Sequence, residues 1–266
     1  MRVIITRPLR EASKWVTALM DSGYQAVALP LVEVAAATDT GSMVEAGQRL
    51  AEYDGIMFVS GNAVEHFFAC NQGLGAMLSA GTAIKTRAFA TGPGTVAALL
   101  RAGVGSACID APDPDSQQFD SEALWAVVGS RMQTGSRVLI VRGAGSSGVD
   151  VLSGEGHGRD WFANQVKLAG ASVDYVVSYQ RVPVRLQGNA LGLARQAASD
   201  GSVWMFSSSE AIANLLGSCP GQDWHAAKAV VTHPRIGESA RNAGFVQVCE
   251  SRPSLASLLA SIESLQ

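Results

Sequence analysis

Short apolar runs alternate with amphipathic segments from the first residues of the chain. Residues 3–6 form an apolar run typical of a β-strand, and a helical pattern follows through Trp15 and Leu19 and stops at Gly23. A second apolar run at residues 25–30 completes a strand–helix–strand unit. This order predicts parallel strands that alternate with helices, with ligand-binding loops at the carboxyl ends of the strands.

The same order of elements returns after the midpoint of the chain. Residues 138–141 predict a strand, residues 142–143 a turn, residues 159–168 a helix and residues 172–179 another strand. The second half therefore repeats the pattern of the first.

Two matched strand–helix junctions support this duplication. Residues 58–64 and 206–212 each pass from a strand end through a serine into a helical apolar face, and residues 90–95 and 231–236 each pass through a proline-containing turn. Repeats of this length indicate a duplicated domain, since solenoid repeats run about 20–50 residues. We expect two similar α/β lobes that face each other, which fits a length of 266 residues.

A glycine- and serine-rich insertion distinguishes the second copy. It runs from Ala144 to His157 without hydrophobic periodicity, which predicts a mobile surface loop. Residues 143–148, which overlap its start, fit the GxGxxG pattern of a dinucleotide-binding loop, so a nicotinamide-dependent oxidoreductase is an alternative. The context does not match, because the third glycine opens no helix and no acidic residue ends the next strand.

Composition and charge exclude several classes of protein. Hydrophobic residues make up 47% and charged residues 16% of the chain, as in compact folded proteins. A net charge of −3 argues against nucleic acid or an anionic membrane as partner. We find no apolar stretch near the roughly 18 residues that a membrane span requires and no targeting segment at the start, so we expect a cytoplasmic protein.

Cysteine and histidine spacing gives no support to a metal centre. The four cysteines form no CxxC pair, and we expect them to be reduced structural thiols. The four histidines lack metal-ligand spacing and lie beside no hydrolase motif. His66 falls within a predicted helix as a surface or core residue, whereas His233 lies in the proposed ligand-binding region.

Ser60 and Ser208 are candidates for binding an anionic ligand. Each stands between a strand and a helix, where a hydroxyl caps exposed N–H groups and the helix start favours negative charge. Capping alone would account for both serines. Two such helix starts at matching positions would also present N–H donors to a ligand with several carboxylates.

The proline-containing turns offer further candidates. Pro93 and Pro234 are ordinary residues for a first helical position, so Thr95 and Arg235 are better candidates for ligand contacts.

Three other side chains could take part in chemistry. Arg7 and Arg142 end equivalent strands, where a guanidinium could grip a carboxylate through two hydrogen bonds or could simply be a solvated charge. Tyr179 ends the strand that begins near Ser172, either as an ordinary half-buried aromatic or as a proton donor.

Taken in order, these motifs resemble the uroporphyrinogen-III synthase family. The segments that carry the resemblance are residues 3–8, 29–34, 58–64, 92–95, 142–143, 179–181 and 206–209, over nearly the whole chain. The resemblance implies two similar α/β lobes with parallel sheets flanked by helices, joined by a two-stranded antiparallel ladder. The implied parts are one lobe of residues 1–34 with 183–266, a second of residues 37–174, and a ladder of residues 31–36 and 175–182.

The resemblance also implies an activity. The family cyclises hydroxymethylbilane, a linear tetrapyrrole with eight carboxylates supplied by the preceding pathway enzyme, to uroporphyrinogen III. Ring D is inverted and water is lost, without metal or cofactor, on the way to haem. A non-catalytic two-lobed sensor of a tetrapyrrole or another small molecule is the alternative, and we expect a monomer.

Tyr179 matches the family's proposed general acid, which would protonate the leaving hydroxyl. The expected substrate contacts are Arg7, Ser60, Gly92, Pro93, Thr95, Arg142, Ser207, Ser208, Ser209, Pro234 and Arg235. The chain departs from the family at residues 233–236, where His-Pro-Arg-Ile replaces the typical Gly-Pro-Thr-Thr. Arg235 is therefore a possible substitute for a threonine contact that Ile236 cannot make.

Overall fold

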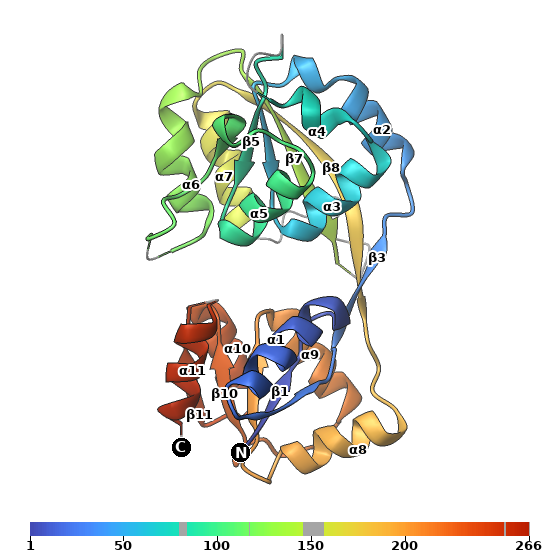
Figure 1. Cartoon of the computed structure of the whole chain (residues 1–266), viewed down its shortest axis with the longest axis vertical. Helices are drawn as coiled ribbons and strands as arrows, with labels where there is room; N and C mark the ends of the chain where they lie inside the picture. Colours follow the sequence, from blue (N-terminus) through green and yellow to red (C-terminus); the bar gives the residue numbers. More distant parts are fainter. Residues whose placement is uncertain (80–83, 117, 146–156, 253, 266) are drawn as a thin grey trace. The chain divides into compact units, whose positions relative to one another are not determined.

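The computed structural model describes residues 1–79, 84–116, 118–145, 157–252 and 254–265. The chain divides into two compact units (Figure 1). Unit 1 comprises Met1–Glu33 and Val182–Gln266, and unit 2 comprises Val34–Arg181. Within the described residues no helix has the length and apolar character that a membrane span requires.

Unit 1 contains a parallel sheet of five strands in the order β11-β10-β9-β1-β2. Its strands are β1 (Arg2–Ile5), β2 (Gln25–Ala28), β9 (Val203–Phe206), β10 (Lys228–Val231) and β11 (Gln247–Glu250). Its helices are α1 (Leu9–Asp21), α8 (Gly188–Ala197), α9 (Ser209–Ser218), α10 (Pro234–Asn242) and α11 (Leu255–Glu263).

Helices cover both faces of the unit 1 sheet, which explains why β1, β9 and β10 are mainly apolar and buried. Val3 and Ile5 of β1 point to the face covered by α1 and α11, whereas Ile4 points to the face covered by α8, α9 and α10. Trp204 on β9 is fully buried on the second face, and its indole N–H donates to the Ala197 carbonyl. The alternation of side chains along each strand therefore builds two separate cores.

Unit 2 contains most of a six-stranded sheet in the order β3-β8-β7-β4-β5-β6. Its strands are β3 (Val32–Ala36), β4 (Gly55–Phe58), β5 (Arg87–Ala90), β6 (Ile109–Asp110), β7 (Arg137–Ala144) and β8 (Ser172–Pro183). Its helices are α2 (Gly41–Gln48), α3 (Gly61–Cys70), α4 (Leu74–Met77), α5 (Pro93–Arg101), α6 (Ser121–Val128) and α7 (His157–Leu168), with short 3-10 turns at Leu50–Glu52, Ser106–Cys108 and Gly129–Arg131.

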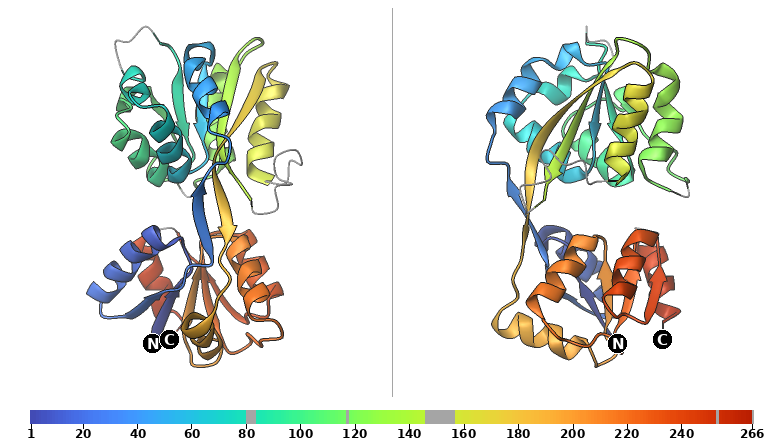
Figure 2. Two further views of the ribbon diagram at one scale, coloured as in Figure 1. Left: turned by 90° about the vertical axis from the view of Figure 1, so that its right-hand side faces the viewer. Right: turned by 180° about the vertical axis from the view of Figure 1, so that it is seen from behind.

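The unit 2 sheet also has a core on each face, and Figure 2 shows helices on both sides of it. Phe58 and Val141 point towards α2, α3 and α5, whereas Met57 and Ile140 point towards α6 and α7. Strands β4 to β8 pair in parallel, and β3 joins β8 as the antiparallel edge. The predicted α/β fold, with parallel sheets, flanking helices and an antiparallel link, is confirmed.

One predicted turn is wrong, because residues 142–143 lie inside β7. This strand continues to Ala144 because β8 runs beside it along its whole length, and the pairing shifts register between Arg142 and Gly143. Of the loop predicted from Ala144 to His157, Ala144 belongs to β7 and His157 begins α7. Residues 146–156 of that loop lie outside the described residues.

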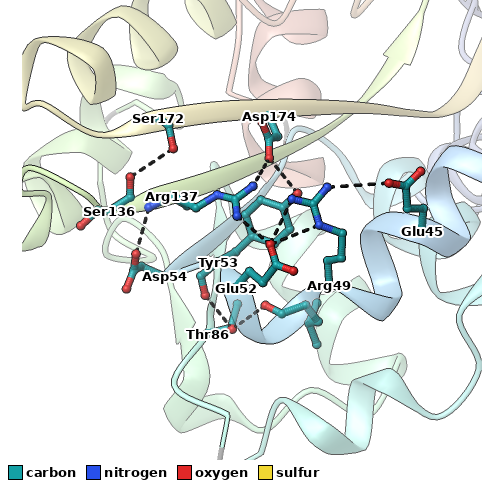
Figure 3. A network of polar contacts seen from close by, with 11 residues as sticks. Glu45, Arg49, Glu52, Tyr53, Asp54, Thr86, Ser136, Arg137, Ser172 and Asp174 are labelled. Atoms are coloured by element: carbon teal, nitrogen blue, oxygen red, sulfur yellow. Dashed lines mark hydrogen bonds and ion pairs between the residues drawn. The ribbon is translucent and has the colours of Figure 1, made fainter.

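A network of charged and polar side chains connects the amino ends of the unit 2 strands (Figure 3). Arg137 bonds Glu52 at 2.6 Å and Asp174 at 2.9 Å, and its guanidinium lies 5.2 Å from the centre of the Tyr53 ring. The Tyr53 hydroxyl donates to Asp174, and burial together with that carboxylate raises the pKa of Tyr53 to about 12. The network ties β7 and β8 to the 3-10 turn before β4.

The four cysteines, all among the described residues, are free thiols. Cys219 is buried in unit 1, and burial raises the pKa of its thiol.

Candidate active site

The carboxyl ends of β4 and β5 lie level with Val141 of the longer strand β7. Phe58 of β4 pairs with Ala90 of β5 and with Val141 of β7. The residues two positions beyond these paired residues are Ser60, Gly92 and Gly143. The parallel register therefore brings together chain segments that are far apart in the sequence.

Ser60 is the N-cap of α3 and also contacts Tyr179. Its side-chain oxygen accepts the Ala63 N–H at 3.2 Å, which confirms the predicted capping role. The same oxygen lies 3.1 Å from the Tyr179 hydroxyl, and either hydroxyl can donate in this bond. Capping alone therefore does not describe Ser60.

Tyr179 lies on β8 and is almost completely buried, with 4% of its surface exposed. Its register partner on β7 is Gly143, and its ring lies where a side chain at position 143 would be. The His66 ring stacks near the Tyr179 ring, with 5.9 Å between centroids and 26° between planes. The phenol thus lies against β7 and meets two side chains of the α3 segment.

Neither His66 nor Gly143 was expected at this site. His66 follows Ser60 by six residues within one helix, and no motif distinguishes it from an ordinary helical histidine. Gly143 is placed by the register shift in the β7–β8 pairing, which leaves no pattern in the sequence. Their recognition depended on the structure.

The turn before α5 supplies the other candidates of unit 2. Gly92 is the N-cap in an extended conformation, Pro93 is the first helical residue as predicted, and Thr95 is 6% exposed. The Thr95 N–H donates to the Gly92 carbonyl at 3.0 Å. A side chain at position 92 would come within 3.1 Å of Phe119, so glycine keeps this turn close to its neighbour.

Unit 1 repeats this arrangement. Phe206 of β9 pairs with Val231 of β10, and the residues two positions beyond are Ser208 and His233. Ser208 accepts the Glu210 N–H at 3.1 Å and so caps α9.

His233 replaces the glycine of the other unit as the helix cap. Its Nδ1 accepts the Arg235 N–H at 3.2 Å, and Pro234 is the first helical residue of α10. In the same junction, Ser239 bonds the Ser209 hydroxyl at 3.0 Å and so connects α9 to α10. Ser207 immediately precedes the α9 cap.

The two arginines expected at equivalent strand ends differ in position. Arg7 follows β1, contacts Glu11 at 3.2 Å and lies 5.3 Å from the Trp15 ring centre. Arg142 lies inside β7 because that strand is longer than predicted, and its guanidinium is 4.9 Å from the Tyr175 ring centre. The prediction that Arg142 ends its strand is therefore wrong.

Metal ligands are not gathered at these junctions. Among the residues that the structure describes, no group of three His, Cys, Asp or Glu side chains could hold a metal ion.

Comparison with known proteins gives the fold a family. A family model described as uroporphyrinogen-III synthase HemD matches residues 13–260. A mutant uroporphyrinogen III synthase from Thermus thermophilus shares 14% identity at a TM-score of 0.59, over 100% of this chain and 98% of that one. The synthase from Helicobacter pylori shares 11% identity at a TM-score of 0.59 and is matched over 100% of both chains.

At such identities the structures establish a shared fold, and among curated protein sequences none matches the chain. The family model spans most of the sequence and includes Ser60, Gly143 and Tyr179. The chain therefore belongs to the uroporphyrinogen-III synthase family.

Proposed function

We propose that this chain cyclises hydroxymethylbilane to uroporphyrinogen III, with inversion of ring D and loss of water, as a lyase of haem biosynthesis. Family membership supports the reaction, and the observation that supports a mechanism is the buried Tyr179 phenol beside the Ser60 hydroxyl. Tyr179 acts as the general acid, and no metal or cofactor is required.

The Ser60 contact gives the phenol a direction for proton transfer. The Ser60 oxygen already accepts the Ala63 N–H, so its own proton can point to the Tyr179 oxygen. The phenolic proton is then available to the leaving hydroxyl of the substrate, which departs as water. After the transfer, the Ser60 O–H donates to the phenolate and stabilises its charge.

Departure of the protonated hydroxyl as water leaves an electrophilic azafulvenium cation on the first ring. The substituted carbon of the last pyrrole attacks it to give a spiro intermediate, and fragmentation and reclosure invert that ring. Reclosure releases one proton from the last pyrrole, which restores the Tyr179 phenol. Because the linear substrate also closes spontaneously without inversion, the main contribution of the protein is to hold the chain in one conformation.

Helix starts supply the groups that bind the substrate carboxylates. The positive ends of the helix dipoles at the starts of α3 and α5 in unit 2, and of α9 and α10 in unit 1, favour anions. Beside them lie the proposed contacts Ser60, Gly92, Pro93, Thr95, Ser207, Ser208, Ser209 and Pro234. Arg235 takes the place of a threonine contact, and Arg7 and Arg142 add positive charge near the strand ends.

We further infer that the enzyme works as a monomer in the cytoplasm and receives its substrate from the preceding pathway enzyme. An unstable linear tetrapyrrole has to be captured before it closes by itself, so the two enzymes are expected to act in the same compartment.

A coupled assay tests the proposal. Hydroxymethylbilane is generated in the presence of this protein, the products are oxidised, and the uroporphyrin isomers are resolved by chromatography. We expect type III in place of type I. Type I alone with folded protein would reject the catalytic function, and saturable tetrapyrrole binding in that case would identify a sensor.

A further inference from the structure

We propose that Gly143 and His66 are positioning residues, which hold the Tyr179 phenol at Ser60 in the orientation needed for proton transfer. The inference rests on the proposed function, because it assigns these residues a role through Tyr179. Gly143 and His66 contact the phenol ring at different places.

Gly143 provides the space in which the phenol lies. A Cβ atom at position 143 would be 2.4, 2.5 and 2.8 Å from three ring carbons of Tyr179, including the carbon that carries the hydroxyl. All three distances are shorter than real Cβ contacts, so the ring or the strand would have to move. Tyr179 is 4% exposed and has little free space into which it can move.

The requirement for glycine at this position is one of space rather than backbone conformation. The φ angle of Gly143 does not lie in the positive region that favours glycine, so alanine could adopt the same backbone angles. A substitution should therefore displace the phenol while leaving β7 paired with β8.

His66 restrains the phenol from the helix. It belongs to α3, whose N-cap is Ser60, so one helix carries both the hydroxyl partner and the stacking partner of Tyr179. A stacked pair of this kind restricts rotation of both rings. His66 is only partly buried, so its removal should not affect the core that Phe67 and Phe68 form beside it.

Position matters to a general acid because its proton travels only a hydrogen-bond length. A donor must lie about 2.6–3.2 Å from the acceptor, and a misplacement of about 1 Å can lower a rate by a factor of about 100. Loss of Gly143 or His66 should thus lower kcat and leave KM, which reports mainly carboxylate binding, nearly unchanged.

The test compares Gly143→Ala, His66→Ala and His66→Phe in the isomer assay. We expect kcat to fall about tenfold or more in Gly143→Ala and about three- to tenfold in His66→Ala. His66→Phe keeps a stacking ring and should recover most of the activity. The matched control is Gly192→Ala in α8, where an added Cβ meets no atom within 4 Å and kcat should not change.

A Tyr179→Phe background shows whether the two residues act through the phenol. There, Gly143→Ala and His66→Ala should cause no further loss of kcat, because the hydroxyl that they position is absent. Equal losses in both backgrounds, or an unchanged kcat in the native background, would overturn the assignment. If Gly143→Ala does not fold, the His66 pair of variants decides.

The wild-type protein separates this inference from the proposed function. If it forms only the type I isomer, the proposed function fails and the assignment falls with it. If it forms type III and the variants keep the native kcat, the assignment alone is wrong.

Discussion

Ser60 combines two roles in a single hydroxyl, and Ser254 offers a control that has one of them. Both serines cap a helix, but only Ser60 also meets Tyr179. We expect Ser60→Ala and Ser254→Ala each to lower the free energy of unfolding by about 1 kcal/mol. Denaturant titration measures this loss.

The two variants should differ in the isomer assay. Ser60→Ala removes the hydrogen bond that stabilises the phenolate, so turnover should fall by about tenfold. Ser254→Ala should retain native turnover. Equal turnover in both variants would show that Ser60 acts only as a cap.

Tyr179→Phe tests the general acid itself. The substitution keeps the buried ring and removes its hydroxyl, so the fold should remain intact. Since general acid catalysis contributes typically 10²–10⁴-fold and the substrate also loses water unaided, we expect turnover to fall by about 100-fold. An unchanged rate would remove Tyr179 from the mechanism.

The sequence predicts the local role of a residue better than its contacts with distant parts of the chain. Ser60 and Ser208 could be predicted as helix caps because a serine hydroxyl between a strand and a helix can accept a backbone N–H of the first helical turn. The contact of Ser60 with Tyr179 joins residues 119 positions apart and depends on the register of the sheet. Sequence periodicity carries no information about such a pairing.

At the scale of elements, the edge strand β6 depends on ion pairs. Asp110 bonds Arg87 and Arg131, each at 2.9 Å. Burial raises the pKa of Asp110, but the bonds to the two guanidinium groups outweigh it and the pKa is lowered. A carboxyl group with a lowered pKa stabilises the fold above its unfolded-state pKa near 4, and this stabilisation is lost as pH falls through the folded-state pKa.

Asp110→Asn should therefore lower the free energy of unfolding by about 1–2 kcal/mol at pH 7. The difference from the wild type should shrink as the pH falls below about 4. Urea titrations at several pH values measure both effects. Glu65→Gln breaks a more exposed pair with Arg101 and should cost less than about 0.5 kcal/mol.

Strands and helices were largely predictable, and the exception is informative. The apolar run at residues 3–6 predicted β1, and the strand ends predicted at residues 58 and 206 are those of β4 and β9. These strands are apolar because both faces of their sheets are buried. Residues 142–143 were predicted to turn because arginine and glycine follow an apolar run. Pairing with the 12-residue strand β8 overrides that local preference.

At the scale of the whole molecule, each hydrophobic core lies within one unit. The two cores of unit 1 contain residues from both ends of the chain, and the two cores of unit 2 contain residues from the middle of the chain. We expect calorimetry to resolve two unfolding transitions. The domain boundaries inferred from the sequence remain predictions that this experiment examines.

Core substitutions assign the transitions. Phe162→Ala in unit 2 and Leu215→Ala in unit 1 each empty a fully buried position, at a cost of about 3–5 and about 2–5 kcal/mol, respectively. Each substitution should lower the melting temperature of one transition and leave the other in place. A single transition that both substitutions shift alike would show that the units unfold together.

Because the sheet of unit 1 combines strands from both ends of the chain, it can be completed only late in synthesis. Ile4 of β1 pairs with Trp204 of β9, so about 200 residues must leave the ribosome before the partner exists. At 5–20 residues per second this delay is about 10–40 s. Unit 2 is contiguous and ends at Arg181, before Trp204 is made. For about 1–5 s the nascent chain should therefore carry a complete unit 2 while β1 has only β2 as a partner.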